Sequence, residues 1–195
     1  MLVYENRVLE SVDGLFEDYS GNTTMENIIT LGTMPRTMNR MFKNSQGLHG
    51  DWRMFYYNDW SKLEEAEECF MNSAYTNIEV IKGSSLRKAA RMYKGSIVTF
   101  DNAQFIYSQN IDMTECFADA KMDVEIVFSK EQDDYSVNLT NAFNNCAELT
   151  HLPKVNYNSK IYNLWEIEGI IGTGCFKGCT KLLEQYGDII PDDWK

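Results

Sequence analysis

The stretches Phe143-Asn-Asn-Cys146 and Phe176-Lys-Gly-Cys179 contain the pattern that decides the fold, an aromatic residue followed three positions later by a small one. The pattern recurs along most of the chain, and the aromatic residues of its six copies are Phe42, Phe70, Tyr93, Phe117, Phe143 and Phe176. Successive aromatic residues lie 28, 23, 24, 26 and 33 positions apart. A period of this length is typical of proteins that stack similar units. The longest interval predicts an insertion within residues 156–168, and such insertions frequently form a binding face.

The other positions of each copy also share a residue type. If the aromatic residue is position 0, then position −4 is apolar in five copies, position −1 is Met, Cys or Ala, and position +3 is Ser, Ala or Cys. These four positions lie on one face of an α-helix, so each unit is predicted to begin with a short helix that buries this face. Position +2 is Asn, Asp or Gly in every copy, which predicts a left-handed residue where the helix ends.

Short apolar stretches with strand character follow these predicted helices, at residues 78–81, 97–100, 122–128 and 149–153. In the third stretch, Met122, Val124 and Ile126 alternate with polar residues and are predicted to share one face of a strand. Stacked helix-then-strand units would place these strands in one parallel sheet. We therefore expect an α/β solenoid in which the stacked strands form one parallel sheet.

All five cysteines fall at position −1 or +3 of a copy. Cys175 and Cys179 are four residues apart, which also suits a metal site or a redox pair. Other copies fill the same positions with Ser, Ala or Met, and no histidine lies near this pair. The prediction is that the cysteines are small buried hydrophobic residues.

Two stretches resemble the BspA-like leucine-rich repeat. They are Ile171-Gly-Thr-Gly-Cys-Phe176-Lys-Gly-Cys179-Thr-Lys-Leu182 and Phe143-Asn-Asn-Cys146-Ala-Glu-Leu149-Thr-His-Leu152-Pro153. The resemblance covers about residues 37–190, is clear at 139–182 and rests on the period alone before Asn110. It implies a short curved leucine-rich-repeat-like array, with a parallel sheet on one face and short helices on the other. From the repeat register we expect a single repeat domain over residues 1–195, with a degenerate N-terminal cap at 1–36, about six repeats at 37–182 and a C-terminal cap at 183–195. Members of this family mostly bind other proteins, and the family brings no catalytic residues with it.

Composition excludes several classes of function. The formal net charge of −11 disfavours binding to nucleic acid, whose phosphates are recognised by Lys and Arg. No apolar run approaches the roughly 20 residues that span a bilayer, so membrane insertion is not expected. The N-terminus lacks the apolar region of a secretory signal, which predicts cytoplasmic synthesis. The glycines at 169–178 do not follow a nucleotide-binding spacing, and His49 and His151 lie in different units, so no cofactor and no metal is expected.

The aromatic run at residues 52–60 provides the strongest candidate for a recognition surface, because exposed Trp and Tyr are enriched at binding hot spots. Whether this run belongs to the core or to an interface stays open at the level of the sequence. Polar residues on the outward side of the predicted strands, namely Glu79, Asp123, Glu125 and His151, complete the candidate interface. Its aromatic members are Trp52, Phe55, Tyr56, Tyr57 and Trp60. The acidic run at 64–68 and the basic residues at 87–91 are interpreted as solvated helix faces.

Together these features predict a non-enzymatic module that binds another protein. One setting is a structural or tail-associated component of a phage virion or of another assembly. The alternative is a bacterial surface adhesin or receptor-binding module that recognises a host protein or glycan. A third class, a cysteine hydrolase, has no local signature in the sequence.

Overall fold

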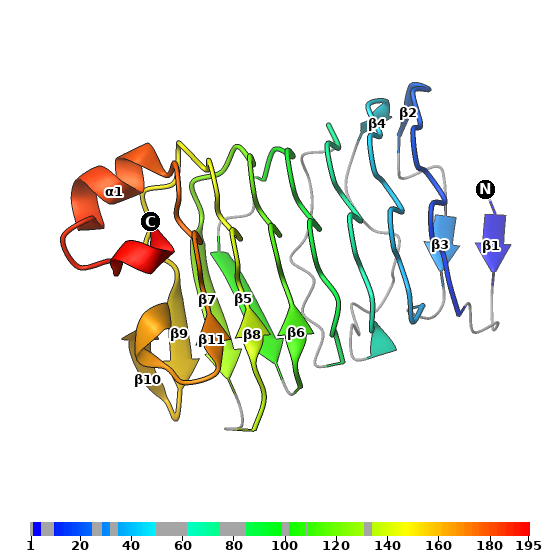
Figure 1. Ribbon diagram of the computed structural model, residues 1–195. Helices are drawn as coiled ribbons and strands as arrows, with labels where there is room; N and C mark the ends of the chain where they lie inside the picture. Colours follow the sequence, from blue (N-terminus) through cyan, green and yellow to red (C-terminus); the bar gives the residue numbers. More distant parts are fainter. Residues whose placement is uncertain are drawn as a thin grey trace.

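The computed structural model describes residues 2–4, 10–24, 29–31, 35–49, 62–74, 85–98, 102–107, 109–130 and 134–195. Its repeating feature is a six-residue turn, and Figure 1 shows successive turns side by side between β1 at one end and α1 at the other. We number these turns in chain order, and turns 1 to 7 are residues 13–18, 39–44, 67–72, 90–95, 114–119, 140–145 and 173–178.

Each turn contains two residues in the left-handed backbone conformation, at positions −2 and +2 relative to the aromatic residue. In turn 2 these residues are Arg40 and Asn44, with φ of 57° and 56°. The left-handed conformation predicted at position +2 is therefore confirmed. The predicted helices are wrong, because a helix needs right-handed residues throughout and the residue at position −2 is left-handed.

The backbone amides of a turn form hydrogen bonds alternately within the turn and with the next one. In turn 2, the amide of Phe42 donates to the carbonyl of Cys69 at 2.7 Å, and the amide of Asn44 donates to that of Met71 at 2.8 Å. Between them, the amide of Lys43 donates back to the carbonyl of Arg40 at 3.2 Å. This alternation pairs the backbone polar groups where successive turns pack against each other and exclude water.

The aromatic residues of consecutive turns stack in a single column through the core. Phe42 and Phe70 lie 5.3 Å apart between ring centroids with an interplanar angle of 3°, and the column continues through the aromatic residues of turns 4 to 7. Phe16 of turn 1 adds a further ring, 5.4 Å from Phe42. The positions predicted to face the core are buried in and beside turn 2: Met38, Met41, Phe42 and Ser45 are all 0% exposed.

The described strands form four separate small sheets. Two parallel pairs join β1 to β3 and β2 to β4, and a three-stranded parallel sheet has the order β11-β8-β6. The fourth sheet has the order β10-β9-β7-β5, in which β9 and β10 are antiparallel and the other pairs are parallel. The strands are β1 Leu2–Tyr4, β2 Thr23–Thr24, β3 Ile29–Leu31, β4 Leu48–His49, β5 Asn102–Tyr107, β6 Ile111–Asp112, β7 Glu125–Lys130, β8 Val137–Asn138, β9 Lys154–Tyr157, β10 Lys160–Asn163 and β11 Ile170–Ile171.

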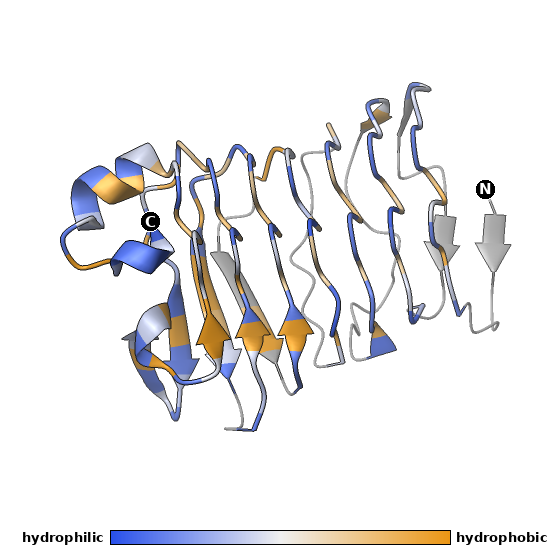
Figure 2. Ribbon diagram, in the orientation of Figure 1, coloured by the Kyte–Doolittle hydropathy of each residue, from blue (hydrophilic) through white to orange (hydrophobic). Residues whose placement is uncertain are grey.

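The hydropathy pattern of the chain follows the strands and the turns. Figure 2 shows hydrophobic residues in β6, β8 and β11, and hydrophilic residues at matching points of successive turns. Met122, Val124 and Ile126 are at most 3% exposed, so the predicted alternation there is confirmed. The predicted strand at 149–153 is wrong, since the strand begins only at Lys154. The predicted strand at 78–81 lies outside the described residues.

The C-terminal end of the stack has its own arrangement. The hairpin β9–β10 turns through Asn158 and Ser159, both with positive φ as a two-residue hairpin of this kind requires, and the 3-10 helix η3 (Leu164–Glu166) follows it. After turn 7 come α1 (Thr180–Tyr186) and the 3-10 helix η4 (Asp192–Trp194). The Trp194 carbonyl accepts the Phe176 amide at 2.8 Å, and its ring lies 6.1 Å from that of Phe176.

The fold class predicted from the sequence is contradicted. The described strands make small separate sheets, one of them mixed, where one continuous parallel sheet was expected. The described residues contain one α-helix, of seven residues, where a row of helices was expected. The structure is an α/β domain with small sheets and not a solenoid. The division into two caps and about six repeats stays a prediction.

Candidate interaction surface

The structure describes three of the nine residues predicted to form an interface. Trp52, Phe55, Tyr56, Tyr57, Trp60 and Glu79 lie outside the described residues. Asp123, Glu125 and His151 are exposed. Of these, Asp123 and His151 are brought together, with 3.0 Å between Oδ1 and Nδ1. Glu125 begins β7 and has its Cα register partner in β5, so it is not part of the same contact.

Asp123 is the centre of a small polar cluster between the segments that follow turns 5 and 6. The backbone amide and the hydroxyl of Thr150 both donate to Oδ1 of Asp123 at 2.8 Å. Partial burial alone would raise the pKa of Asp123, but the two hydrogen bonds from Thr150 and the contact with His151 outweigh it and lower the pKa. The cluster joins neighbouring segments, and about half of each of the Asp123 and His151 side chains is exposed.

The five cysteines are buried and their thiols are poorly reactive. All five are free thiols, and burial raises the pKa of each, to about 12 for Cys179. The thiols of Cys146 and Cys179 donate to the carbonyls of Phe117 and Phe143, both at 2.9 Å. The prediction of small buried residues is confirmed, and such thiols are poor nucleophiles because the thiolate is the reactive form. Within the part of the chain that the structure describes, no group of three or more His, Cys, Asp or Glu side chains could hold a metal ion.

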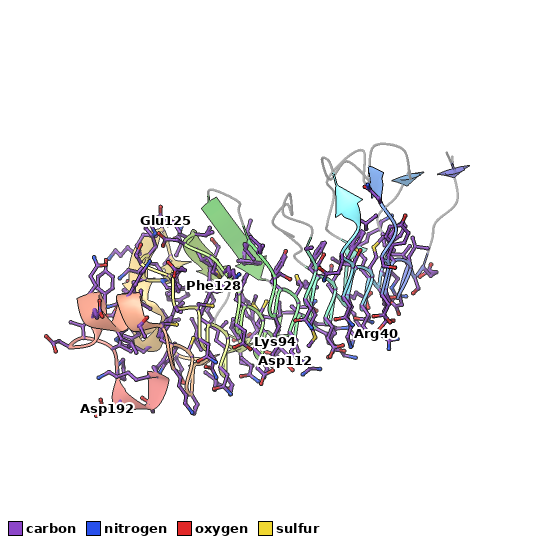
Figure 3. All side chains as sticks on the ribbon, turned by 90° about the horizontal axis from the view of Figure 1, so that it is seen from above. Arg40, Lys94, Asp112, Glu125, Phe128 and Asp192 are labelled. Carbon is purple, nitrogen blue, oxygen red and sulfur yellow. The ribbon has the colours of Figure 1, made fainter. Side chains whose placement is uncertain are left out.

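A second surface, absent from the sequence-based predictions, combines the acidic run at 64–68 with the basic residues at 87–94. The acidic run begins before turn 3 and continues into it, and the basic residues begin before turn 4 and continue into it, so the stacking of turns sets one run beside the other. Figure 3 shows Arg40 and Lys94 on one long side of the molecule, with Glu125 and Phe128 toward the other. We define the charged face as Arg40, Lys43, Glu64, Glu65, Glu67, Glu68, Arg87, Lys88, Arg91, Lys94 and Glu115.

Ion pairs connect each turn of the charged face to the next. Glu68 is held from both sides, by Nζ of Lys43 at 2.7 Å and by Nε of Arg91 at 2.8 Å. The hydrogen bond from Lys43 is the largest influence on Glu68, and together with Arg91 it lowers the pKa of this carboxyl against the effect of burial. Further along, Nζ of Lys94 lies 2.7 Å from Oε2 of Glu115.

The same pairing continues at the start of the turns. Nη2 of Arg87 lies 2.7 Å from Oε1 of Glu65, and Nζ of Lys88 lies 3.1 Å from the same oxygen. Burial alone would raise the pKa of Glu65, but Lys88, Asn39 and Arg87 lower it. The acidic and basic runs therefore neutralise each other within one chain.

The charged residues at position −2 have an unfavourable backbone conformation. Arg40, Glu68, Arg91 and Glu115 occupy this position in turns 2 to 5, with φ between 55° and 57°. In the other described turns the position is filled by residues that adopt positive φ easily, namely Gly14, Asn141 and Gly174. A left-handed conformation costs a side chain of this kind roughly 1–2 kcal/mol relative to glycine.

A groove of about 310 Å³ opens along the charged face. Arg40 lines this groove, and its Nε lies 3.9 Å from a carboxylate oxygen of Glu17. About half of the Arg40 side chain is exposed, so its charge is available to a partner. The groove is lined by Asp13, Asn39, Arg40, Glu67, Glu68 and Arg91.

One signal in the sequence could have found this surface. The acidic run and the basic run are one repeat apart, since Glu68 precedes Arg91 by 23 positions and Phe70 precedes Tyr93 by the same number. Either run by itself indicates no more than the wet side of a helix. Alignment of the charges by repeat position would have placed the two runs in contact.

Comparison of the chain with family models, with curated proteins and with solved structures finds no significant match. The resemblance to BspA-like repeats therefore stays a prediction. Among the described residues, no helix combines the length and the apolar character that crossing a membrane would need.

Proposed function

We propose that this protein is a non-enzymatic protein-interaction module that contacts its partner through the charged face. The observation that carries the proposal is the row of charged residues at position −2 in four consecutive turns, each in a left-handed conformation. Unfavourable backbone conformations of this kind are found preferentially at functional sites.

An energetic comparison supports the same proposal. Each left-handed charged residue costs about 1–2 kcal/mol, whereas an exposed ion pair contributes about 0–1 kcal/mol. Arg40 makes the balance clearest, because its recorded partner, Glu17, is 3.9 Å away. Glycine or asparagine at position 40 would give a more stable turn, so folding stability does not account for the charge of Arg40. Recognition of a partner does.

The deeply buried thiols add support for a non-enzymatic role. A cysteine hydrolase needs an accessible thiolate, and burial raises the pKa of all five thiols. The setting of the module, in a virion or another assembly, is part of the proposal. The adhesin alternative depends on the aromatic run: if Trp52→Ala and Tyr57→Ala leave binding to a host surface intact, that alternative fails.

Native isolation of the tagged full-length chain tests the proposed function. The wild-type chain is compared with the variant Glu68→Gly/Arg91→Gly, which removes two charges of the face and relieves the backbone at both positions. Asn141→Gly is the matched control, because it makes the same type of change at position −2 of turn 6, outside the charged face. We expect a stable complex with the wild type and the control, and loss of the complex with the double variant.

Two results would overturn the proposal. A wild-type chain that stays monomeric and captures nothing contradicts an interaction role. A complex that survives the double variant, when the variant melts at or above the temperature of the wild type, contradicts a role for the charged face.

A further inference from the structure

The charges of the charged face alternate in sign at position −2. From turn 2 to turn 5 the residues are Arg40, Glu68, Arg91 and Glu115, which read plus, minus, plus, minus. The turns that carry them are evenly spaced, with ring centroids 5.3, 5.4 and 5.2 Å apart from Phe42 to Phe117. When this row is read in the opposite direction it becomes minus, plus, minus, plus. The row is therefore its own complement.

From this pattern we infer that the partner of the charged face is a second copy of the same chain. The inference rests on the proposed function, since it names the partner at the same surface. The two copies would be related by a two-fold axis that lies between turns 3 and 4 and runs parallel to them. Such an axis sets Arg40 of one copy against Glu115 of the other, and Glu68 against Arg91, with each contact made twice.

The remaining charges fit the same axis. Glu64 in the segment before turn 3 meets Arg87 before turn 4, and Glu65 meets Lys88. The other three charges lie opposite uncharged positions: Glu67 opposite the buried Ala90, Lys94 opposite Met71, and Lys43 opposite the buried Ala118. At each of these positions the axis brings together opposite charges, or a charge and an uncharged side chain.

Other arrangements of two copies are less favourable. If the two faces met with their turns in the same order, so that each turn lay against the same turn of the other copy, each charge at position −2 would lie against its own equivalent, and like charges in contact cost affinity. An arrangement that extends the stack at its C-terminal end would have to displace Trp194, whose carbonyl accepts the Phe176 amide of turn 7. The two-fold arrangement leaves the ion pairs within each chain in place and adds an opposite charge from the other copy to each charge at position −2.

Salt concentration distinguishes the local attraction from the overall repulsion. Each chain has a formal net charge of −11, so two copies repel each other over long distances. At about 0.15 M salt the Debye length is roughly 8 Å, which screens the distant charges more than the contacts within an interface. We expect a dimer at this ionic strength that dissociates as salt rises further, because its contacts are mainly ion pairs.

Sedimentation or light scattering with charge-reversal variants tests the inference. Arg40→Glu and Glu115→Arg each place two pairs of like charges in the proposed dimer, and we expect each variant alone to raise the dissociation constant at least about tenfold. An equimolar mixture of the two variants should restore the dimer. In the mixed pair the two reversed charges lie opposite each other, and the unchanged Glu115 of one chain meets the unchanged Arg40 of the other. The chain mass of 22.6 kDa makes monomer and dimer easy to separate.

Two controls keep the test specific. The double variant Arg40→Glu/Glu115→Arg should dimerise by itself, and Lys177→Glu, an exposed charge of turn 7, should leave the wild-type dimer unchanged. Circular dichroism melts of all variants show whether each is folded. If Glu115→Arg fails to fold after it loses Lys94, Arg40→Glu mixed with Glu115→Gln still separates the outcomes, since the mixture should dimerise more tightly than Arg40→Glu alone.

The outcomes separate this inference from the proposed function. A wild-type monomer that captures a different protein, with loss of capture in Glu68→Gly/Arg91→Gly, overturns the self-association and keeps the proposed function. A dimer that neither Arg40→Glu nor Glu115→Arg weakens overturns this interface. A monomer that captures nothing overturns both. Dimers lost in the single variants and recovered in their mixture support both.

Discussion

Replacement of Phe143 by alanine tests the aromatic column directly. Phe143 is 0% exposed and stacks between Phe117 and Phe176, with centroid separations of 5.1 and 5.8 Å. Truncation of a buried phenylalanine costs about 3–5 kcal/mol in the free energy of unfolding. The two ring contacts account for part of that loss, at about 0.5–1.5 kcal/mol each. We expect a cost near the upper end of the range, because the rings above and below are fixed by their own turns and cannot collapse into the cavity.

Phe16→Ala is the matched control for this prediction. Phe16 stacks on Phe42 in the first turn, but it is only partly buried. Its replacement should cost clearly less than that of Phe143. Urea unfolding followed by circular dichroism measures both losses in the free energy of unfolding. In thermal melts, a protein of this size should lose roughly 2–4 °C in melting temperature per kcal/mol. If Phe143→Ala costs no more than Phe16→Ala, the column does not contribute to stability as described.

Three further predictions concern single positions of the turns. Arg40→Gly should raise the free energy of unfolding by about 0.5–1 kcal/mol in urea titrations, because relief of the left-handed backbone exceeds the entropy cost of glycine; a loss of stability would contradict the strain. Cys146→Ser should cost about 1 kcal/mol or less by thermal unfolding, since Ser96 fills the same position and donates to the equivalent carbonyl, that of Phe70; a loss above about 3 kcal/mol would show that the thiol packs differently. The pKa of Glu68 is lowered in the folded chain, so its contribution to stability is present above its unfolded pKa and is lost as pH falls through the folded value. Glu68→Gln should therefore lose stability at pH near 7 and show a shallower decline in acid, and an unchanged pH profile would refute this.

The core was predictable because the repeat determines which positions are buried. Cys146 and Cys179 can be assigned to packing from the repeat alone, since other copies have Ser or Ala at the same position. The left-handed residues at position +2 were also predictable, because Asn44 and its equivalents are residues that tolerate this conformation.

The helices were wrong for a physical reason that the sequence hides. A helix and a pair of tight turns bury the same positions, −4, −1, 0 and +3, so the apolar pattern does not distinguish them. Position −2 distinguishes the two structures, because its residue is left-handed in the turns and would be right-handed in a helix. Arg and Glu rarely adopt the left-handed conformation, so Arg40, Glu68, Arg91 and Glu115 gave no sign of it in the sequence. Only contacts with the neighbouring turns hold them there.

The division into separate sheets, the start of β9 and the charged face were missed because they depend on contacts between units. The stretch at 149–153 has the composition of a strand, yet Thr150 donates to Asp123 and the strand starts three residues after His151. Glu68 and Arg91 form an ion pair only because turn 3 lies beside turn 4. Neither arrangement follows from the residues of one unit alone.

The most direct test of the proposed interaction surface is the mass in solution of Arg40→Glu and Glu115→Arg, measured separately and as an equimolar mixture. Self-association through the charged face predicts monomers of each variant alone and a dimer of the mixture at about 0.15 M salt. A mixture that stays monomeric while the wild type dimerises, or single variants that dimerise as tightly as the wild type, would contradict it.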